Sequence, residues 1–293
     1  MDSTNKPNGF KENTMAVNLV LKYASDIEKR FIFESLVFGK GTAKYDWTGT
    51  KKVRSITPVT VALNNYDIGD SDSTAARFGA LTEVQDTLNT YDIERDRSFN
   101  LAIDKGNNES QMLVKKAGVV MRMEVDEQLI PEMDTWALSK YASTSNVQVS
   151  TVLALTKSNI IGAYASAVAA LVNQKVPATG LISWISATEF SKLVTAPEFL
   201  NLEKLGSNAV GKGVVGECQG VQIIRVPDSY MPAKTSFIVA HPSALMPVKK
   251  IETLRILEEH PDIDGAALQG RVMYDAFVLA QKVKGVYVHK NAA

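Results

Sequence analysis

The sequence predicts a mixed α+β protein built around an extended two-stranded arm and an unusually long helix. Apolar residues from Tyr91 to Ile103 alternate with polar ones, which is the two-residue period of a strand. A helical pattern of roughly 34 residues follows, from about Glu109 to about Ala142. After Ser150 the pattern changes to that of an ordinary α/β unit.

The arm is predicted as two strands joined by a loop. The first strand covers Lys51–Leu63, in which Pro58 marks an edge strand or a bend because proline lacks the backbone N–H. Asn64–Arg77 is rich in turn residues and forms the loop. The second strand covers Leu88–Asp104. A strand pair with charges on both faces is a poor candidate for burial in the hydrophobic core of its own subunit. We therefore interpret it as an arm that packs on a neighbouring molecule.

The helix after the arm is predicted to be about 50 Å long. Its apolar stripe runs from Leu113 through Leu129 to Tyr141. Pro131 should kink or restart the helix, because proline lacks the N–H and clashes with the preceding turn. Two helices that meet at Ile130–Pro131 are the alternative interpretation.

The remaining elements follow from short apolar runs and their flanking turn residues. The expected helices are Lys157–Gln174 and Thr188–Val194, and the expected strands are Leu181–Ser186, Val221–Val226, Phe237–Ala240, Lys249–Glu258, Arg271–Gln281 and Gly285–His289.

Composition and charge exclude several classes of protein. The chain has 293 residues, 45% of them hydrophobic, enough for a sizeable core. Lys and Arg total 32, as do Asp and Glu, and this balance disfavours a dedicated nucleic-acid binder. The single cysteine, Cys218, excludes an internal disulfide. The first residues lack a signal core and the most apolar run, Ile160–Val172, is too short to span a bilayer, so we expect a soluble chain.

Catalytic patterns are weak throughout the sequence. Gly206–Gly213 matches a phosphate-binding P-loop except at Gly213, where Ser or Thr should stand, and strand-like sequence follows where a helix should begin. His241, His260 and His289 are too far apart in sequence for a typical metal site. No base is nominated for Cys218, so we interpret it as a packed thiol. We expect no catalytic residue, metal or cofactor.

Charges alternate in sign along the second arm strand at Glu94, Arg95, Asp96 and Arg97. In a monomer this pattern is a plain solvated edge. Between subunits it would form a row of complementary ion pairs that fixes orientation and register. We favour the second interpretation because the arm has little else to hold it.

Several stretches, taken in order, carry a family resemblance over nearly the whole chain. They are Tyr91–Lys105 leading into Val125–Tyr141, Lys175–Leu193, Gly216–Pro232 and Gly270–His289. Their order and spacing resemble the major capsid proteins of tailed bacteriophages, which have the Hong Kong 97-type fold.

This resemblance implies five parts of the chain. Residues 1–44 would be an N-terminal arm and residues 45–105 an extended β-hairpin called the E-loop. Residues 106–143 would form the long spine helix of the peripheral (P) domain, and residues 144–245 the axial (A) domain. Residues 246–293 would supply the returning strands of the P domain.

The resemblance also implies a function. Members of the family assemble as pentamers and hexamers into an icosahedral shell that encloses double-stranded DNA without sequence-specific binding. The expected partners are further copies of the chain, a separate scaffolding protein and a portal, with no membrane. The expected location is the virion capsid, after assembly in the cytoplasm of the host bacterium. The candidate inter-subunit contacts are Tyr91, Ile93, Glu94, Arg95, Asp96, Arg97 and Phe99.

Two departures from the family bear on maturation. The chain starts almost at the arm, from which we infer a separate scaffold or a mature form rather than a cleaved scaffolding segment. Some relatives join an E-loop lysine to a P-domain asparagine. Lys51 and Lys52 could supply the lysine, but residues 242–290 contain no asparagine and the first is Asn291. We therefore expect no covalent cross-linking.

Two alternative functions stay open. An encapsulin-type bacterial compartment shares this fold and encloses enzymes instead of DNA. A nucleotide-binding enzyme would use the Gly206–Gly213 loop.

Overall fold

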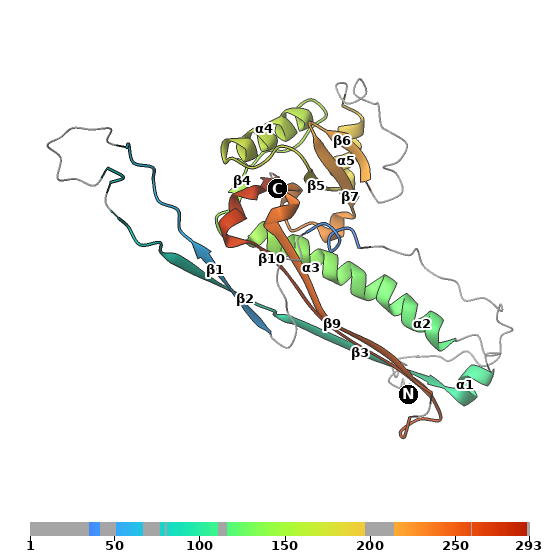
Figure 1. Ribbon diagram of the computed structural model, residues 1–293. Helices are drawn as coiled ribbons and strands as arrows, with labels where there is room; N and C mark the ends of the chain where they lie inside the picture. The colour runs from blue at the N-terminus through green and yellow to red at the C-terminus, as the bar shows by residue number, and fades with distance from the viewer. Residues whose placement is uncertain are drawn as a thin grey trace, which may run out of the picture.

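The protein consists of a projecting hairpin, a long helix on a narrow sheet, and a wider sheet with helices of its own (Figure 1). This arrangement confirms a mixed α+β protein. The computed structural model describes residues 35–41, 51–66, 77–79, 81–110, 116–196, 214–258 and 260–291.

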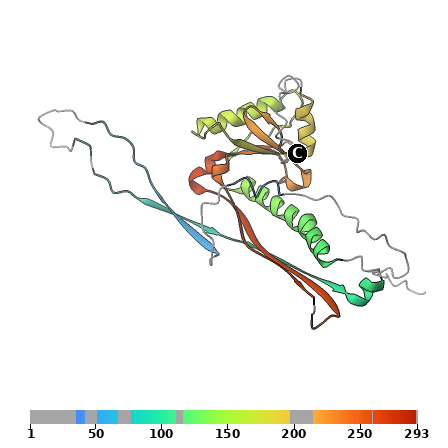
Figure 2. The ribbon, with the colours of Figure 1, turned by 45° about the vertical axis from the view of Figure 1, so that its right-hand side comes forward.

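The hairpin pairs β1 (Lys52–Pro58) with β2 (Asp86–Asp92) in antiparallel register, from Lys52 opposite Asp92 to Pro58 opposite Asp86. It extends well away from the rest of the molecule in both ribbon views (Figures 1 and 2). The first strand is shorter than the predicted Lys51–Leu63. It ends at Pro58, where a proline removes a ladder donor.

The predicted strand Leu88–Asp104 is two strands in two different sheets. β2 ends at Asp92, and β3 (Arg95–Asp104) belongs to a three-stranded sheet in the order β3-β10-β9. The other two strands of this antiparallel sheet are β9 (Leu245–Leu257) and β10 (Gly265–Val278). At the break, the backbone N–H of Glu94 donates to the side chain of Asp275 at 2.9 Å.

A continuous helical segment from Ala117 to Ser143 lies along this sheet. It comprises α2 (Ala117–Glu124), the π-turn η1 (Val125–Leu129) and α3 (Ile130–Ser143). The prediction of a start near Glu109 was wrong, because Lys116 has an extended backbone and the long segment begins at Ala117, whereas Glu109 belongs to the short helix α1 (Lys105–Ser110) that directly follows β3.

The chain passes through Pro131 without starting a second helix. The N–H of Ile130 bonds to the carbonyl of Val125, five residues back, and this wider π-turn lies just before the proline. A proline ring clashes with the carbonyl four residues before it, and a wide turn relieves such crowding.

A six-stranded mixed sheet lies beyond the helix, in the order β4-β11-β8-β5-β7-β6. Its strands are β4 (Gln148–Val149), β5 (Leu181–Ser186), β6 (Val214–Cys218), β7 (Val221–Val226), β8 (Thr235–Ala240) and β11 (Val286–Lys290). The short turn η3 (Asp228–Tyr230) connects β7 to β8 within this sheet, whereas η4 (Pro242–Ala244) leads from β8 to β9 and η5 (Ala280–Gly285) leads from β10 back to β11.

Both faces of the six-stranded sheet are covered. On one face, α4 (Ile160–Asn173) and α5 (Ala187–Val194) contribute Tyr164 and Phe190 to an apolar cluster. On the other face, Tyr141 of α3 packs near Trp184. The last strand, β11, pairs with β4 and β8 in this sheet, whereas the sequence grouped it with the strands of residues 246–293.

The segment 35–41 is fixed to both halves of this body. The carboxylate of Asp134 on α3 accepts bonds from Ser35 Oγ at 2.7 Å and from the N–H of Leu36 at 2.8 Å. The indole of Trp184 on β5 donates to the carbonyl of Leu36 at 3.0 Å. Val37 is buried between these elements.

Candidate assembly interface

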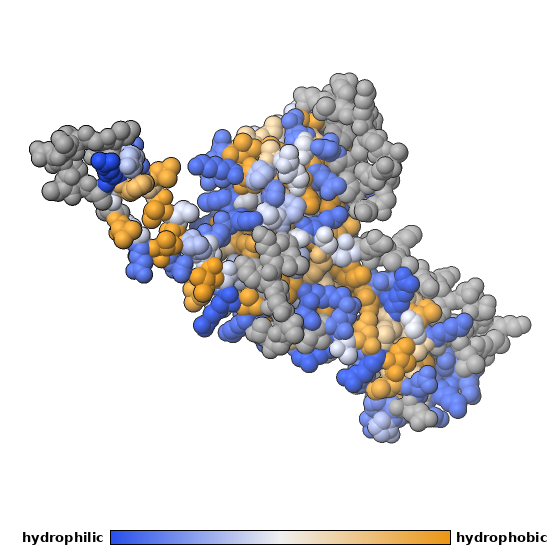
Figure 3. Space-filling view, viewed as in Figure 1, coloured by the Kyte–Doolittle hydropathy of each residue, from blue (hydrophilic) through white to orange (hydrophobic). Residues whose placement is uncertain are grey.

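The hairpin carries a long run of exposed apolar side chains, visible as orange atoms along the arm in Figure 3. Its large exposed apolar residues are Ile56, Val59, Val61, Leu63, Tyr66, Phe78, Leu81, Val84 and Leu88. Leu63 and Leu81 are fully exposed. Contiguous apolar surface of this kind is typical of a site that binds another protein.

The two limbs of the hairpin are joined at both ends. Near the tip, the rings of Tyr66 and Phe78 meet edge-on with centroids 4.9 Å apart. Gly79 has a positive φ of 82° and lies against the amide of Asn64, where a side chain would collide. The ladder between β1 and β2 closes the base, so the exposed apolar residues sit on a defined arm.

Two of the predicted contact residues are buried in the subunit itself at the base of the hairpin. Tyr91 and Ile93 pack with Met246, Val248 and other apolar residues of β9 and β10. The Tyr91 hydroxyl also accepts a bond from the N–H of Ala280 at 3.2 Å. Their burial fastens the arm to the body, because each fully buried side chain of this size contributes roughly 1.5–3 kcal/mol.

The predicted charge row also finds partners inside the chain. Glu94 pairs with Lys140 of α3 at 2.7 Å, and Arg97 pairs with Glu132 of the same helix at 2.6 Å. These pairs are exposed, and each contributes little to stability because water screens it. They nevertheless orient β3 against the long helix.

The other two charged residues of this row are Asp96, which pairs with a neighbouring strand, and Arg95, which lies over an aromatic ring. Asp96 accepts two bonds from the guanidinium of Arg271 on β10, at 2.9 and 2.6 Å, and these bonds lower the pKa of Asp96. The guanidinium of Arg95 lies 3.8 Å from the centroid of the Trp136 ring. The alternating charges therefore have local partners, and their role between subunits stays a prediction.

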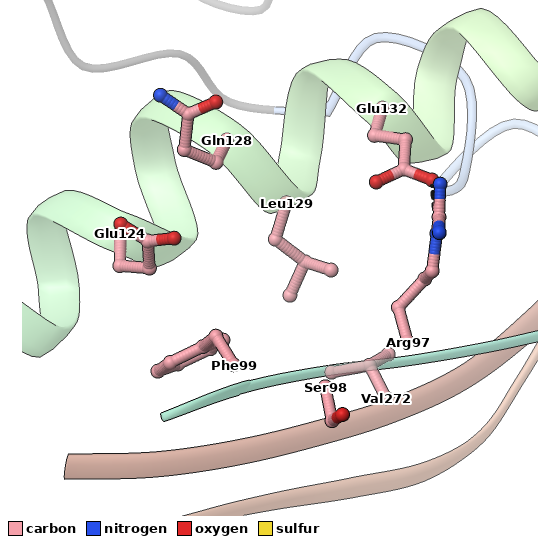
Figure 4. A pocket seen from close by; sticks show the side chains of 8 residues that line it. All are labelled: Arg97, Ser98, Phe99, Glu124, Gln128, Leu129, Glu132 and Val272. Atoms are coloured by element: carbon pink, nitrogen blue, oxygen red, sulfur yellow. Dashed lines mark hydrogen bonds and ion pairs between the residues drawn. The ribbon is translucent and has the colours of Figure 1, made fainter. Parts of the chain in front are cut away.

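A pocket of about 260 Å³ opens between the long helix and the three-stranded sheet (Figure 4). Leu129 from the π-turn points down into it, and Phe99 of β3 and Val272 of β10 form its apolar floor. The Arg97–Glu132 pair closes one end. Two of the predicted contact residues, Arg97 and Phe99, thus line this pocket.

The floor of the pocket depends on a close contact between two strands. Phe99 lies directly opposite Gly270, and a Cβ at Gly270 would lie 2.2 Å from the Phe99 ring. Only glycine lets the ring lie flat on the backbone of β10.

The other candidate residues from the sequence, the Gly206–Gly213 loop, Cys218 and His289, do not form a functional site among the residues that the structure describes. The Gly206–Gly213 loop lies outside the described residues, and the strand β6 begins directly after it at Val214. Burial raises the pKa of Cys218 to about 11, which leaves its thiol protonated. His289 stacks on Phe237 with centroids 4.7 Å apart.

Two negative findings concern only the part of the chain that the structure describes. Within it, no three His, Cys, Asp or Glu side chains gather as metal ligands. No helix there has the length and apolar character needed to cross a bilayer.

Comparisons with solved structures identify the fold. No protein-family model matches the sequence, and no curated protein matches it. The capsid structure of the cyanophage P-SCSP1u superposes with a TM-score of 0.69 at 16% identity, over 99% of each chain. The mature capsid of bacteriophage PhiM1 gives a TM-score of 0.67 at 13% identity, over 92% of this chain and 91% of that one. The chain has the fold of phage capsid proteins.

This capsid fold also occurs in a virus-like particle from Pyrococcus furiosus, with a TM-score of 0.53 at 12% identity over 82% of this chain and 86% of that one. Among the residues that the structure describes, the most exposed large apolar side chains are those of Leu63 and Leu81, and neither was among the contacts predicted from the sequence. The alternation of Val59, Val61 and Leu63 beyond Pro58 was the signal that could have found the first of them.

Proposed function

We propose that the protein is the major capsid protein of a tailed phage, which self-assembles into an icosahedral shell around double-stranded DNA. The observation that carries the proposal is the apolar hairpin, which has no cover within the described chain, on a body with the phage capsid fold. A shell subunit needs such a surface because each copy must bind its neighbours.

The proposal assigns the parts of the Hong Kong 97-type fold. The hairpin is the E-loop within residues 45–105, and the helix is the spine within residues 106–143. The six-stranded sheet is the core of the A domain, residues 144–245, with β11 as an added strand. The three-stranded sheet belongs to the P domain with residues 246–293, and residues 1–44 form the N-arm.

The proposed assembly uses the hairpin as the adhesive element. The E-loop of one subunit lies across the spine helix and P domain of its neighbour, where its exposed apolar side chains become buried. The charges from Glu94 to Arg97 sit beside this contact and favour one register. Many weak repeated contacts permit error correction, and closure of pentamers and hexamers into a shell holds the product.

The remaining partners follow from the same proposal. A separate scaffolding protein and a portal act in assembly, in the cytoplasm of the host bacterium, and the product is the virion capsid. Zero formal net charge suits a container, since strong binding to DNA would hinder packaging and release.

Electron microscopy of the purified, concentrated protein tests the proposal. Closed shells are the expected result. Monomers at every concentration and salt condition, with or without a co-expressed scaffold, would contradict it.

A hairpin deletion tests the proposed adhesive element. Removing residues 64–80 leaves the two sheets and the helix intact, so the thermal transition should persist while shells become rare. Shells of normal yield and size from this variant would show that the hairpin tip is dispensable.

The virus-like particle from Pyrococcus furiosus supports a second candidate, an encapsulin-type compartment that encloses enzymes. The content of purified particles separates the two. Packaged double-stranded DNA and neighbouring terminase and portal genes support the phage capsid, whereas a neighbouring cargo enzyme with a docking tail supports the compartment.

A further inference from the structure

The hairpin tip and the pocket lie on opposite sides of the hairpin base. β2 and β3 follow one another along nearly one line, with the hairpin on one side and β3 with the helix on the other (Figures 1 and 2). Leu63 lies eleven residues beyond Lys52, or up to about 36 Å along an extended limb. The hairpin therefore points away from the pocket of its own subunit.

The pocket has the size and chemistry to receive one apolar side chain. Its volume of about 260 Å³ corresponds to several water molecules at about 30 Å³ each, which is enough for a branched side chain. The half-buried Phe99 supplies most of the apolar surface that a ligand can reach, because Leu129 and Val272 behind it are only 8% and 1% exposed. The polar rim around this small apolar floor resembles the anatomy of a protein–protein contact.

We propose that this pocket is the receptor for Leu63 of a second copy of the chain. This inference rests on the proposed shell function and names the contact that joins neighbouring subunits. A fully exposed leucine on the hairpin and a pocket with an apolar floor on the other side of the hairpin base form a head-to-tail pair. Such heterologous contacts generate rings when the rotation closes, as pentamers and hexamers require.

Leu63 fits the pocket better than the equally exposed Leu81 because of its surroundings. The rim carries the carboxylates of Glu124 and Glu132 and the guanidinium of Arg97, so two negative charges and one positive charge leave a net charge of −1. Leu63 is flanked by the uncharged Ala62 and Asn64. Leu81 is followed two residues later by Glu83, whose carboxylate would face the acidic rim.

The pocket also depends on the π-turn of the helix. Leu129 is the last residue of η1, so the turn that accommodates Pro131 also sets the position of the pocket's apolar wall. The proline of the long helix is thereby linked to subunit contact rather than only to helix shape.

Disulfide trapping tests the contact in the full chain. Leu63→Cys is combined with Gln128→Cys on the exposed rim of the pocket, and the concentrated protein is mildly oxidised. A disulfide requires Cα atoms less than about 7 Å apart, so a bond between Leu63→Cys and Gln128→Cys forms only where the hairpin reaches the pocket, and the two single-cysteine variants report disulfides between like positions. We expect a ladder of dimers and larger multimers on a non-reducing gel. The native Cys218 is buried and does not compete.

The matched control is Leu81→Cys with Gln128→Cys, which places an equally exposed thiol on the other limb. Cross-linking in the Leu81→Cys double variant but not in the Leu63→Cys double variant overturns the choice of Leu63. Absence of cross-linking in both double variants, in protein that forms shells, overturns the pocket as receptor while leaving the shell function standing. Failure of the wild type to form shells contradicts the shell function. The cross-link between Leu63→Cys and Gln128→Cys in solution then still tests the contact between two copies of the chain.

Assembly thresholds give a second readout. Leu63→Asp should raise the protein concentration needed for shells at least about tenfold, since a buried leucine contact is lost and a charge meets the acidic rim. Leu81→Asp should shift the threshold by less. Equal thresholds for the wild type and Leu63→Asp overturn the proposal. Because Leu63 and Leu81 are fully exposed, neither substitution disturbs the folded subunit.

Discussion

The indole Nε1 of Trp136 donates a hydrogen bond to Oδ1 of Asp275 at 2.9 Å, and this bond joins the long helix to the centre of the three-stranded sheet. The same carboxylate accepts bonds from the backbone N–H groups of Glu94 and Ala276. One fully buried side chain therefore holds the helix, the central strand and the point where the hairpin meets the body.

Replacing Asp275 with alanine should destabilise the subunit by at least about 1–3 kcal/mol. A buried donor left unpaired costs about 1–3 kcal/mol, and the buried Ala276 N–H loses its acceptor together with two partly buried donors, the Glu94 N–H and the Trp136 indole. Denaturant unfolding measures the loss. Asp262→Ala is the control, because its side chain is 84% exposed and its removal should change stability by less than about 0.5 kcal/mol. Equal stability of the two variants would contradict the role of Asp275.

Gly270→Ala should destabilise the subunit by about 1–3 kcal/mol, because the added methyl group collides with the Phe99 ring. Gly118→Ala is the matched substitution, since nothing lies within 4 Å of its Cβ position in α2. It should raise stability by up to about 1 kcal/mol through helix propensity. Thermal unfolding of both variants checks the opposite signs, and shifts in the same direction would rule out the close packing at Gly270.

Much of the fold could be predicted from local pattern. Leu181–Ser186 and Val221–Val226 have the bounds expected from the sequence, because each is a short apolar run between turn residues. The long helix was also expected, although its start was misplaced. Local periodicity suffices where one segment has one favoured conformation.

The choice of strand partners could not be predicted in this way. The alternation from Tyr91 to Ile103 is compatible with one long strand, and the break at Ile93–Glu94 depends on Asp275, far away in sequence. The same limit applies to β11, whose apolar residues suit either sheet. The pocket arises from the helix and two strands together, so no single stretch of sequence predicts it.

The pH dependence of stability should report on Asp134. Burial raises the pKa of this carboxyl, although its bonds to Ser35 and Leu36 oppose the shift. A raised folded-state pKa means that the folded chain binds more protons than the unfolded chain, so stability from this group declines as pH rises through that pKa. Asp134→Asn keeps the shape and, with its amide oxygen, the bond from the Leu36 N–H, while its amide NH2 donates to Ser35 Oγ in place of the bond that the carboxylate accepted, and the charge is removed.

Relative to the wild type, Asp134→Asn should therefore be more stable at pH 7, and its advantage should shrink as pH falls towards the ordinary aspartate pKa of about 3.9. Unfolding curves at several pH values measure the difference. Asp134→Ala, which leaves the Leu36 N–H without its acceptor, should be less stable at every pH. An advantage of the Asn variant that grows with acid would reverse the sign of the shift.

Mature particles should contain no covalent cross-links between subunits. Lys52 is held by Asp92 at 2.9 Å on the hairpin, and residues 242–290 offer no asparagine as its partner. Asn291 follows β11, and its backbone N–H bonds to the carbonyl of Lys234 beside the six-stranded sheet, away from the three-stranded sheet that carries the pocket. Boiled, reduced particles should run as one band near 31.9 kDa on a denaturing gel. A ladder of covalent multimers from wild-type particles would show that the prediction is wrong. Its loss in Lys51→Arg with Lys52→Arg would assign the cross-link to these lysines, and its persistence would point to different cross-linking chemistry.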